Sequence, residues 1–216
     1  IDLSLSSLAY AMRKTRELEV ENIEYMQADI LNLKKLNRKF DIIESAGVLH
    51  HMDDPIKGWK VLADCLKPNG LMSIGLYSEV ARQDIVKIRA EIAKSGHSFN
   101  NQTIKSFRQT LIKSSKDHHQ RILKSADFYT LSTVKDLLFH VKEHRFTIAK
   151  IKKCLSQLGL MFCGFDSDRI LQDFQKTYSD PEDLYDLDKW QQHEVTNPKT
   201  KVKSEVTIEG LQSFLV

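Results

Sequence analysis

The sequence predicts an α/β fold built on a doubly wound, mostly parallel sheet that carries a helical insertion. Short apolar runs alternate with helical segments from Ile1 to Tyr77, which is the pattern of parallel strands joined by crossover helices. These runs end in acidic or small residues, as strands do where a sheet meets a ligand. The alternation stops after Tyr77. We therefore expect part of the sheet domain at 1–77, a helical cap at 78–125, and the rest of the sheet domain at 126–216.

Local signals support each element of the first part. Ser4 precedes apolar residues at helical spacing and is suited to cap a helix. Asp54 and Pro55 suit the first turn of a second helix, and a KPNG turn at 67–70 precedes the last apolar run. The expected strands are residues 1–3, 22–29, 40–44 and 71–77, and the expected helices are residues 4–18 and 53–66.

The later parts read differently. Apolar spacing is helical from residue 78 to 125. Ser132 is expected to cap a helix that runs to His140, and Gly159 is expected to end a helix at 147–158. The remaining expected elements are a strand at 160–165, helices at 168–178 and 181–190, and a C-terminal VTIEGLQSFLV that forms an edge strand or a disordered end.

Composition indicates an ordinary globular protein. The chain has 216 residues, of which 41% are hydrophobic and 28% charged. No run approaches the roughly 18 apolar residues that span a bilayer, and the first residues lack the features of a secretory signal. The three cysteines show no CxxC spacing, so neither a zinc site nor a disulfide framework is expected. A cytoplasmic location and no membrane partner follow as expectations.

Positive charge is concentrated in one segment. The net charge is +3, yet residues 80–127 carry ten Lys or Arg against four Asp or Glu. A basic surface of this kind attracts an anionic small molecule or nucleic acid. A solvated helical face explains the same pattern, and the sequence leaves both open.

Chemistry-bearing residues stand at the predicted strand ends. Asp2 and Asp29 each follow an apolar run, where a carboxylate can accept hydrogen bonds from ribose hydroxyls or simply begin a turn or helix. The segment FDIIESAGVLHHM ends a strand in small and polar residues, as the rim of a pocket does. Its His51 could act as a base near neutral pH. Alternatively, one histidine of the pair His50 and His51 caps or packs against the next helix while the other faces solvent.

Other polar and aromatic residues receive structural expectations. His118 and His119 have no carboxylate or cysteine at metal-ligand spacing in the sequence, so we expect a solvated surface and no metal. Glu143 and His144 are expected to form a surface salt bridge, with a position facing the pocket as the alternative. Trp59 and Trp190 are expected to pack in the core.

Four stretches together resemble a class I S-adenosylmethionine-dependent methyltransferase. IDLS, ENIEYMQADIL and FDIIESAGVLHHMDDPIKGWKVLADCLKPNGLMSIGLY are similar to the second through fifth strands of that Rossmann-like fold, with the insertion following the fifth. FYTLSTVKDLLFHVKEHRFTIAKIKKCLSQLGLMFCGFD resembles a bacterial branch of the family. The resemblance implies that Asp2 binds the ribose, that Asp29 and Ile30 hold the adenine, and that Glu44 and Ser45 lie near the methionine. The implied cofactor-binding set is Asp2, Leu3, Asp29, Ile30, Glu44 and Ser45.

The resemblance also implies an activity and a difference from the family. The implied reaction is methyl transfer from S-adenosylmethionine to an unidentified acceptor, either a small molecule or a macromolecule, with an anionic acceptor favoured by the basic segment and nucleic acid still open. It identifies no catalytic residue, which leaves His51 as the candidate. The family's first strand and glycine-rich loop would precede Ile1, and all eight glycines lie at Gly47 or later. We therefore expect the chain to be a fragment.

Two other functions fit the same residues. A nicotinamide-dependent oxidoreductase also uses an acidic residue after its second strand to bind ribose. An inactive binding or partner module is the non-enzymatic alternative. Titration with S-adenosylhomocysteine and with NAD discriminates among the three.

Overall fold

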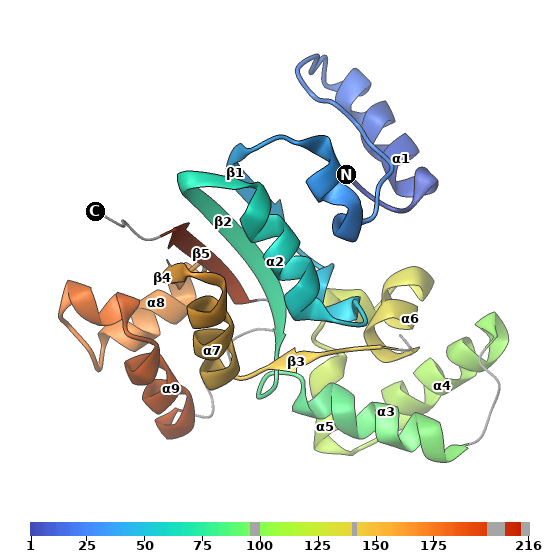
Figure 1. Cartoon of the computed structure of the whole chain (residues 1–216). Coiled ribbons are helices and arrows are strands. Elements are labelled where there is room, and N and C mark those ends of the chain that lie inside the picture. The colour runs from blue at the N-terminus through green and yellow to red at the C-terminus, as the bar shows by residue number, and fades with distance from the viewer. Residues whose placement is uncertain (96–99, 140–141, 198–205, 213–216) are drawn as a thin grey trace.

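A five-stranded mixed sheet organises the molecule (Figure 1). The computed structural model describes residues 1–95, 100–139, 142–197 and 206–212. The strands follow one another in the order β1-β2-β5-β4, and β3 pairs with the end of β2. β1 and β3 run parallel to β2, whereas β5 runs antiparallel to both β2 and β4. The bounds are β1 Phe40–Ser45, β2 Leu66–Ser78, β3 Arg145–Phe146, β4 Leu160–Phe165 and β5 Val206–Gln212. The predicted α/β class is confirmed.

The N-terminal segment forms a helix beside a minimal strand pair. Helix α1 (Leu5–Glu17) begins where predicted, with the Ser4 hydroxyl accepting a hydrogen bond from the Ser7 amide. The predicted strands 1–3 and 22–29 are reduced to one parallel bridge between Asp2 and Gln27. Only two backbone hydrogen bonds join them within the described residues, at 3.2 Å each. A pair this short forms a single rung and does not extend into strands.

Helix α2 (Pro55–Cys65) connects β1 to β2 as predicted. The Asp54 carboxylate accepts hydrogen bonds from the amides of the first turn, and Pro55 occupies the first helical position. The KPNG segment was predicted to be a turn before the strand. This boundary is wrong, because β2 already includes residues 67–70. The register shifts there, and Asn69 adopts a positive φ of 61°. The four residues thus form a bulge within the strand's bounds.

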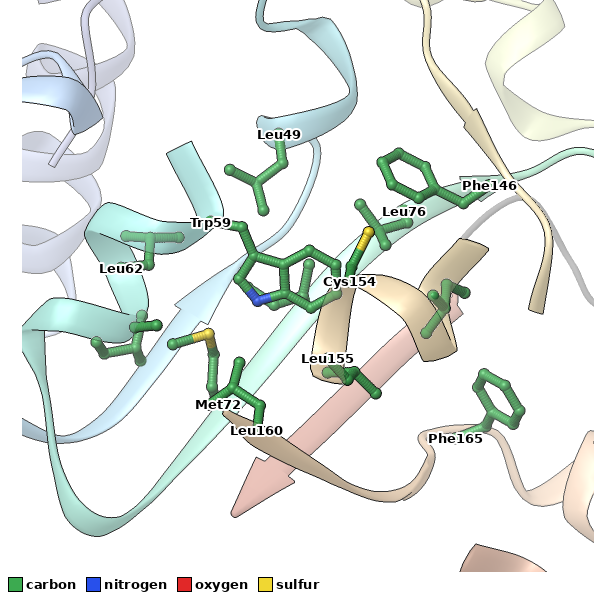
Figure 2. Packing of buried hydrophobic residues seen from close by; sticks show 14 of the residues in the cluster. Leu49, Trp59, Leu62, Met72, Leu76, Phe146, Cys154, Leu155, Leu160 and Phe165 are labelled. Atoms are coloured by element: carbon green, nitrogen blue, oxygen red, sulfur yellow. The ribbon is translucent and has the colours of Figure 1, made fainter. Parts of the chain in front are cut away.

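The main core packs helices onto β2. Trp59 from α2 is 1% exposed and lies among Leu62, Met72 and Cys154 (Figure 2). Trp190 is equally buried and stacks on Phe174, with 3.7 Å between ring centroids. The packing role predicted for both tryptophans is confirmed. The other helices that contribute to this core are α7 Ile148–Leu158, α8 Asp168–Gln175, η4 Pro181–Tyr185 and α9 Leu187–Thr196. The single helix predicted at 181–190 is therefore divided into two.

A second hydrophobic core lies in the helices that follow β2 (Figure 1). Its buried side chains extend from Ile85 to Leu138. The predicted boundary at residue 125 therefore falls within this group of helices rather than at its end. The elements are α3 Gln83–Ser95, α4 Asn101–Lys113, α5 Asp117–Ile122, η3 Ala126–Phe128 and α6 Leu131–Phe139. We call this group the helical cluster.

The ends of two helices test the sequence predictions. Gly159 ends α7 in the left-handed conformation, with φ 65°, as predicted. The predicted cap at Ser132 is wrong, because Ser132 lies inside α6 and the Thr130 hydroxyl accepts the hydrogen bond from the Thr133 amide. The predicted helix end at His140 lies outside the described residues.

The C-terminal strand is the main topological correction. β5 pairs with β2 on one side and β4 on the other, so it is an interior strand and not the expected edge strand. It lies between β2 and β4 and runs antiparallel to both. Among the helices that the structure describes, none is long and apolar enough to cross a membrane.

Candidate functional site

A cavity of about 500 Å³ opens where three segments converge. It is lined by the first residues of the chain, by the residues that lead into the short helix η1 (Ile30–Leu36), and by β1 with the turn after it. Its volume lies within the range of small-molecule sites, about 300–1,000 Å³. All six residues that the resemblance implies line this cavity: Asp2, Leu3, Asp29, Ile30, Glu44 and Ser45.

Local structure explains why these residues meet. Asp2 forms a parallel bridge with Gln27, and Asp29 follows Gln27 by two residues. β1 ends at Ser45, and Gly47 takes a positive φ of 73° as the chain turns away. Parallel segments bring their carboxyl ends to the same edge of a sheet. The structure therefore collects at one edge side chains that lie far apart in the sequence.

Both aspartates have a local role as well as a place in the cavity. Asp2 Oδ1 accepts a hydrogen bond from the Ser4 amide at 2.7 Å, and Asp29 Oδ1 accepts one from the Leu31 amide at 2.8 Å. One carboxylate oxygen of each aspartate therefore serves a local turn or helix start, as the alternative interpretation of the sequence predicts. Within the described residues, Oδ2 of each carboxylate has no hydrogen bond. Each can still accept from a ligand.

Ser45 supplies a polar atom without a protein partner. The residue is 7% exposed, it lines the cavity, and Oγ has no hydrogen-bond partner within the described part of the chain. A buried hydroxyl left in this way costs free energy. A ligand with a polar group at this wall would satisfy Ser45 Oγ.

Apolar side chains form another wall of the cavity. Leu33, Ile43 and Leu62 line it, and all three belong to the main core. A cavity with an apolar wall and a few polar groups is typical of small-molecule sites, in which the polar groups fix the orientation of the ligand. The residues present therefore fit an adenosyl group, with the carboxylates beside hydroxyls and the apolar wall beside the base.

The histidine pair lies elsewhere. His50 is fully buried, stacks on Tyr77 with 3.7 Å between ring centroids, and hydrogen-bonds through Nδ1 to the Gly75 carbonyl. His51 Nδ1 hydrogen-bonds to the Lys142 carbonyl at 2.9 Å. Neither lines the cavity, so the structure does not bring the catalytic candidate His51 to the other predicted site residues. Both instead join the short helix η2 (Leu49–His51) to distant segments.

A buried ion network lies beyond His50. The Glu143 side chain is 2% exposed and pairs with Arg82, which is 1% exposed, and with Arg89 at 2.8 Å. Arg82 also lies over the Tyr77 ring at 3.6 Å. The prediction that Glu143 forms a surface salt bridge is wrong. Arg82 and Arg89 lie far from Glu143 in the sequence, so no local pattern could indicate its burial.

The first third of the chain and the overall fold both match known proteins. Residues 1–74 match the family model for a methyltransferase domain. An uncharacterized protein of Synechococcus sp. is 25% identical over 205 residues, which cover 89% of this chain and 49% of that protein. PKMT2 from Rickettsia typhi has a TM-score of 0.69 at 19% identity, covering 100% of this chain and 43% of that one.

A second structure of PKMT2, in complex with AdoHcy (S-adenosylhomocysteine), has a TM-score of 0.64 at 17% identity and covers 100% of this chain and 44% of its own. The chain spans about half the length of the curated relative and less than half of these solved chains. At these identities the solved structures establish the fold. Residues 1–74 thus match a methyltransferase domain, and the chain as a whole shares the fold of PKMT2.

Proposed function

We propose that the protein transfers a methyl group from S-adenosylmethionine and that the cavity at the carboxyl end of β1 binds the adenosyl part. The observation that carries this proposal is the convergence of the strand-end residues on one cavity of about 500 Å³. The family match to residues 1–74 supports it, because that range contains every predicted cofactor-binding residue.

Each residue has a chemical role in this proposal. Asp2 accepts hydrogen bonds from the ribose hydroxyls through Oδ2. Asp29 and Ile30 hold the adenine, the carboxylate at its amino edge and the aliphatic side chain against its face. Glu44 and Ser45 lie toward the methionine part, where a carboxylate can pair with an ammonium and the unsatisfied Ser45 Oγ can hydrogen-bond.

The chemistry needs alignment more than acid–base help. S-adenosylmethionine supplies a sulfonium methyl that an acceptor oxygen, nitrogen or carbon attacks in line. Holding two reactants in the right geometry can account for much of the lowering of the barrier. This agrees with the position of His51 outside the cavity. The protein's task is therefore to fix the cofactor and exclude water around it.

The helical cluster supports an anionic acceptor. Six of its lysines are exposed and form no ion pair within the described residues: Lys87, Lys94, Lys105, Lys113, Lys124 and Lys135. Unpaired surface lysines raise the local concentration of anionic molecules. We propose that the methyl acceptor, or the molecule that carries it, bears negative charge.

Replacing the cavity carboxylates tests the proposed site. Asp2→Asn and Asp29→Asn are each expected to weaken binding of S-adenosylhomocysteine about 10- to 150-fold, since a hydrogen bond to a charged group contributes about 1.5–3 kcal/mol. Isothermal titration calorimetry on the chain measures the change. Asp41→Asn is the matched control, because Asp41 is an exposed residue of β1 outside the cavity lining. Tighter binding of NAD than of S-adenosylhomocysteine would instead support an oxidoreductase.

A further inference from the structure

Two helices of the helical cluster bring an acidic residue against a histidine pair. α3 and α5 pack side by side (Figure 1). Glu91 of α3 meets His118 and His119 of α5: Oε1 lies 3.0 Å from His118 Nε2, and Oε2 lies 2.7 Å from His119 Nε2. One ligand atom from each of the three residues lies within 4.8 Å of the other two. The sequence hides this cluster because Glu91 and the histidines belong to separate helices.

The cluster is partly sealed from water. The side chains of Glu91, His118 and His119 are 32%, 17% and 4% exposed, so the expectation of a solvated surface is wrong for His119. Its second ring nitrogen, Nδ1, is buried and has no hydrogen-bond partner in the part of the chain that the structure describes. The two imidazole rings meet edge to face, with 4.3 Å between centroids and 66° between planes. Both Nε2 atoms therefore face the carboxylate.

The three side chains are of the kinds that a transition metal binds. A carboxylate and two imidazoles are the ligands that zinc and neighbouring divalent metals prefer.

We propose that Glu91, His118 and His119 bind a divalent transition-metal ion of the zinc type. Zinc with nitrogen and oxygen ligands at about 2.0–2.2 Å places neighbouring ligand atoms about 3.3 Å apart in a tetrahedron. The distance from Glu91 Oε1 to His118 Nε2, 3.0 Å, is about 0.3 Å shorter than that, and the distance from Oε2 to His119 Nε2, 2.7 Å, is about 0.6 Å shorter. The partly exposed glutamate can move outward by this amount to admit the ion. The three protein ligands leave a fourth position to water or an anion.

Lys116 pairs with the same carboxylate that the ion would bind. Its ammonium lies 2.9 Å from Glu91 Oε1, and its side chain is 57% exposed. Exposed ion pairs contribute little to stability, so a bound metal ion can displace the ammonium into water. The metal would then join α3 to α5 and stabilise the helical cluster, independently of the adenosyl site.

Zinc titration of the whole chain, prepared without a histidine tag and freed of metal by a chelator, tests this proposal. Calorimetry is expected to show one Zn²⁺ bound per chain, and the melting temperature is expected to rise with zinc concentration. Glu91→Gln and His118→Ala should each weaken zinc binding by more than about 100-fold, the upper end of what loss of an outer-shell partner costs. Neither side chain is fully buried, and circular dichroism without metal verifies that both variants fold.

Replacing Lys116 is expected to strengthen zinc binding, the opposite of the effect of replacing a ligand. Lys116→Met should tighten zinc binding about two- to fivefold by removing the competing ammonium. Lys113→Met, the same change at another exposed lysine nearby, should leave the affinity unchanged. Absence of zinc binding by the wild-type chain at millimolar concentration would overturn the proposal. Binding that Glu91→Gln and His118→Ala leave intact would overturn it too, because the ion would then lie elsewhere.

Discussion

Replacing Glu143 by alanine is expected to lower the free energy of unfolding by about 3–5 kcal/mol, the cost of removing one partner from a buried ion pair. The loss leaves the Arg82 guanidinium, which is 1% exposed, without its carboxylate. Arg89 and Arg145 lose the same partner, at 2.8 and 3.6 Å. The Glu143 carboxylate thus contacts three arginines, which lie just after β2, in α3 and in β3.

Urea denaturation of the variant and the wild type measures this effect. Lys142→Ala is the matched control, because Lys142 is the preceding residue and pairs with Asp53 at the exposed surface. Its cost should stay below about 1 kcal/mol. The two variants losing similar stability would contradict the assigned burial of Glu143. The arginines lower the pKa of Glu143 although burial raises it, so this stabilisation holds above the ordinary carboxyl pKa and is lost as the pH falls through the lowered value.

Acidification from pH 7 to pH 4 is expected to remove up to about 3 kcal/mol of stability through His50 alone. Burial lowers the pKa of His50 from 6.5 to about 4, with further lowering by His51 and Arg82, against the opposing hydrogen bond to Gly75 and the charge of Glu143. Nδ1 donates to the Gly75 carbonyl, and Nε2 is buried with no hydrogen-bond partner within the described residues. A second proton would therefore have no acceptor.

Stability falls on acidification because His50 binds a proton more readily in the unfolded chain than in the folded one. Unfolded His50 takes up a proton below about pH 6.5, whereas the folded side chain stays neutral until about pH 4. Protonation therefore favours the unfolded state progressively between these two values. His50→Asn keeps a donor for Gly75 but does not titrate, so its stability should fall less from pH 7 to pH 4 than that of the wild type. Equal slopes for wild type and His50→Asn would contradict the account.

Elements with a local signal were predicted from the sequence. Ser4, the Asp54–Pro55 pair and Gly159 each act on backbone groups within a few residues, so their chemistry is readable from neighbours alone. The cavity was also predictable, because parallel segments bring their ends to one edge regardless of side-chain detail. Pattern and topology were sufficient to indicate where these residues meet.

Features that depend on distant pairing were not predictable. Burial of Glu143 requires arginines from another part of the chain, and the Glu91 cluster requires two helices to pack in one particular register. The interior position of β5 depends on a space between β2 and β4 that no property of its own residues reveals. The count of charged residues in the sequence predicted that the helical cluster is basic, but it did not predict the ion pairs within the cluster.

The central claim is that three segment ends form one adenosyl-binding cavity, and amide NMR during titration with S-adenosylhomocysteine tests it most directly. The account predicts that the largest shifts fall at residues 2–3, 29–30 and 44–46, which line the cavity. Amides of the helical cluster should move little. Shifts concentrated in the helical cluster, with residues 2–3 and 29–30 unchanged at saturation, would contradict the claim.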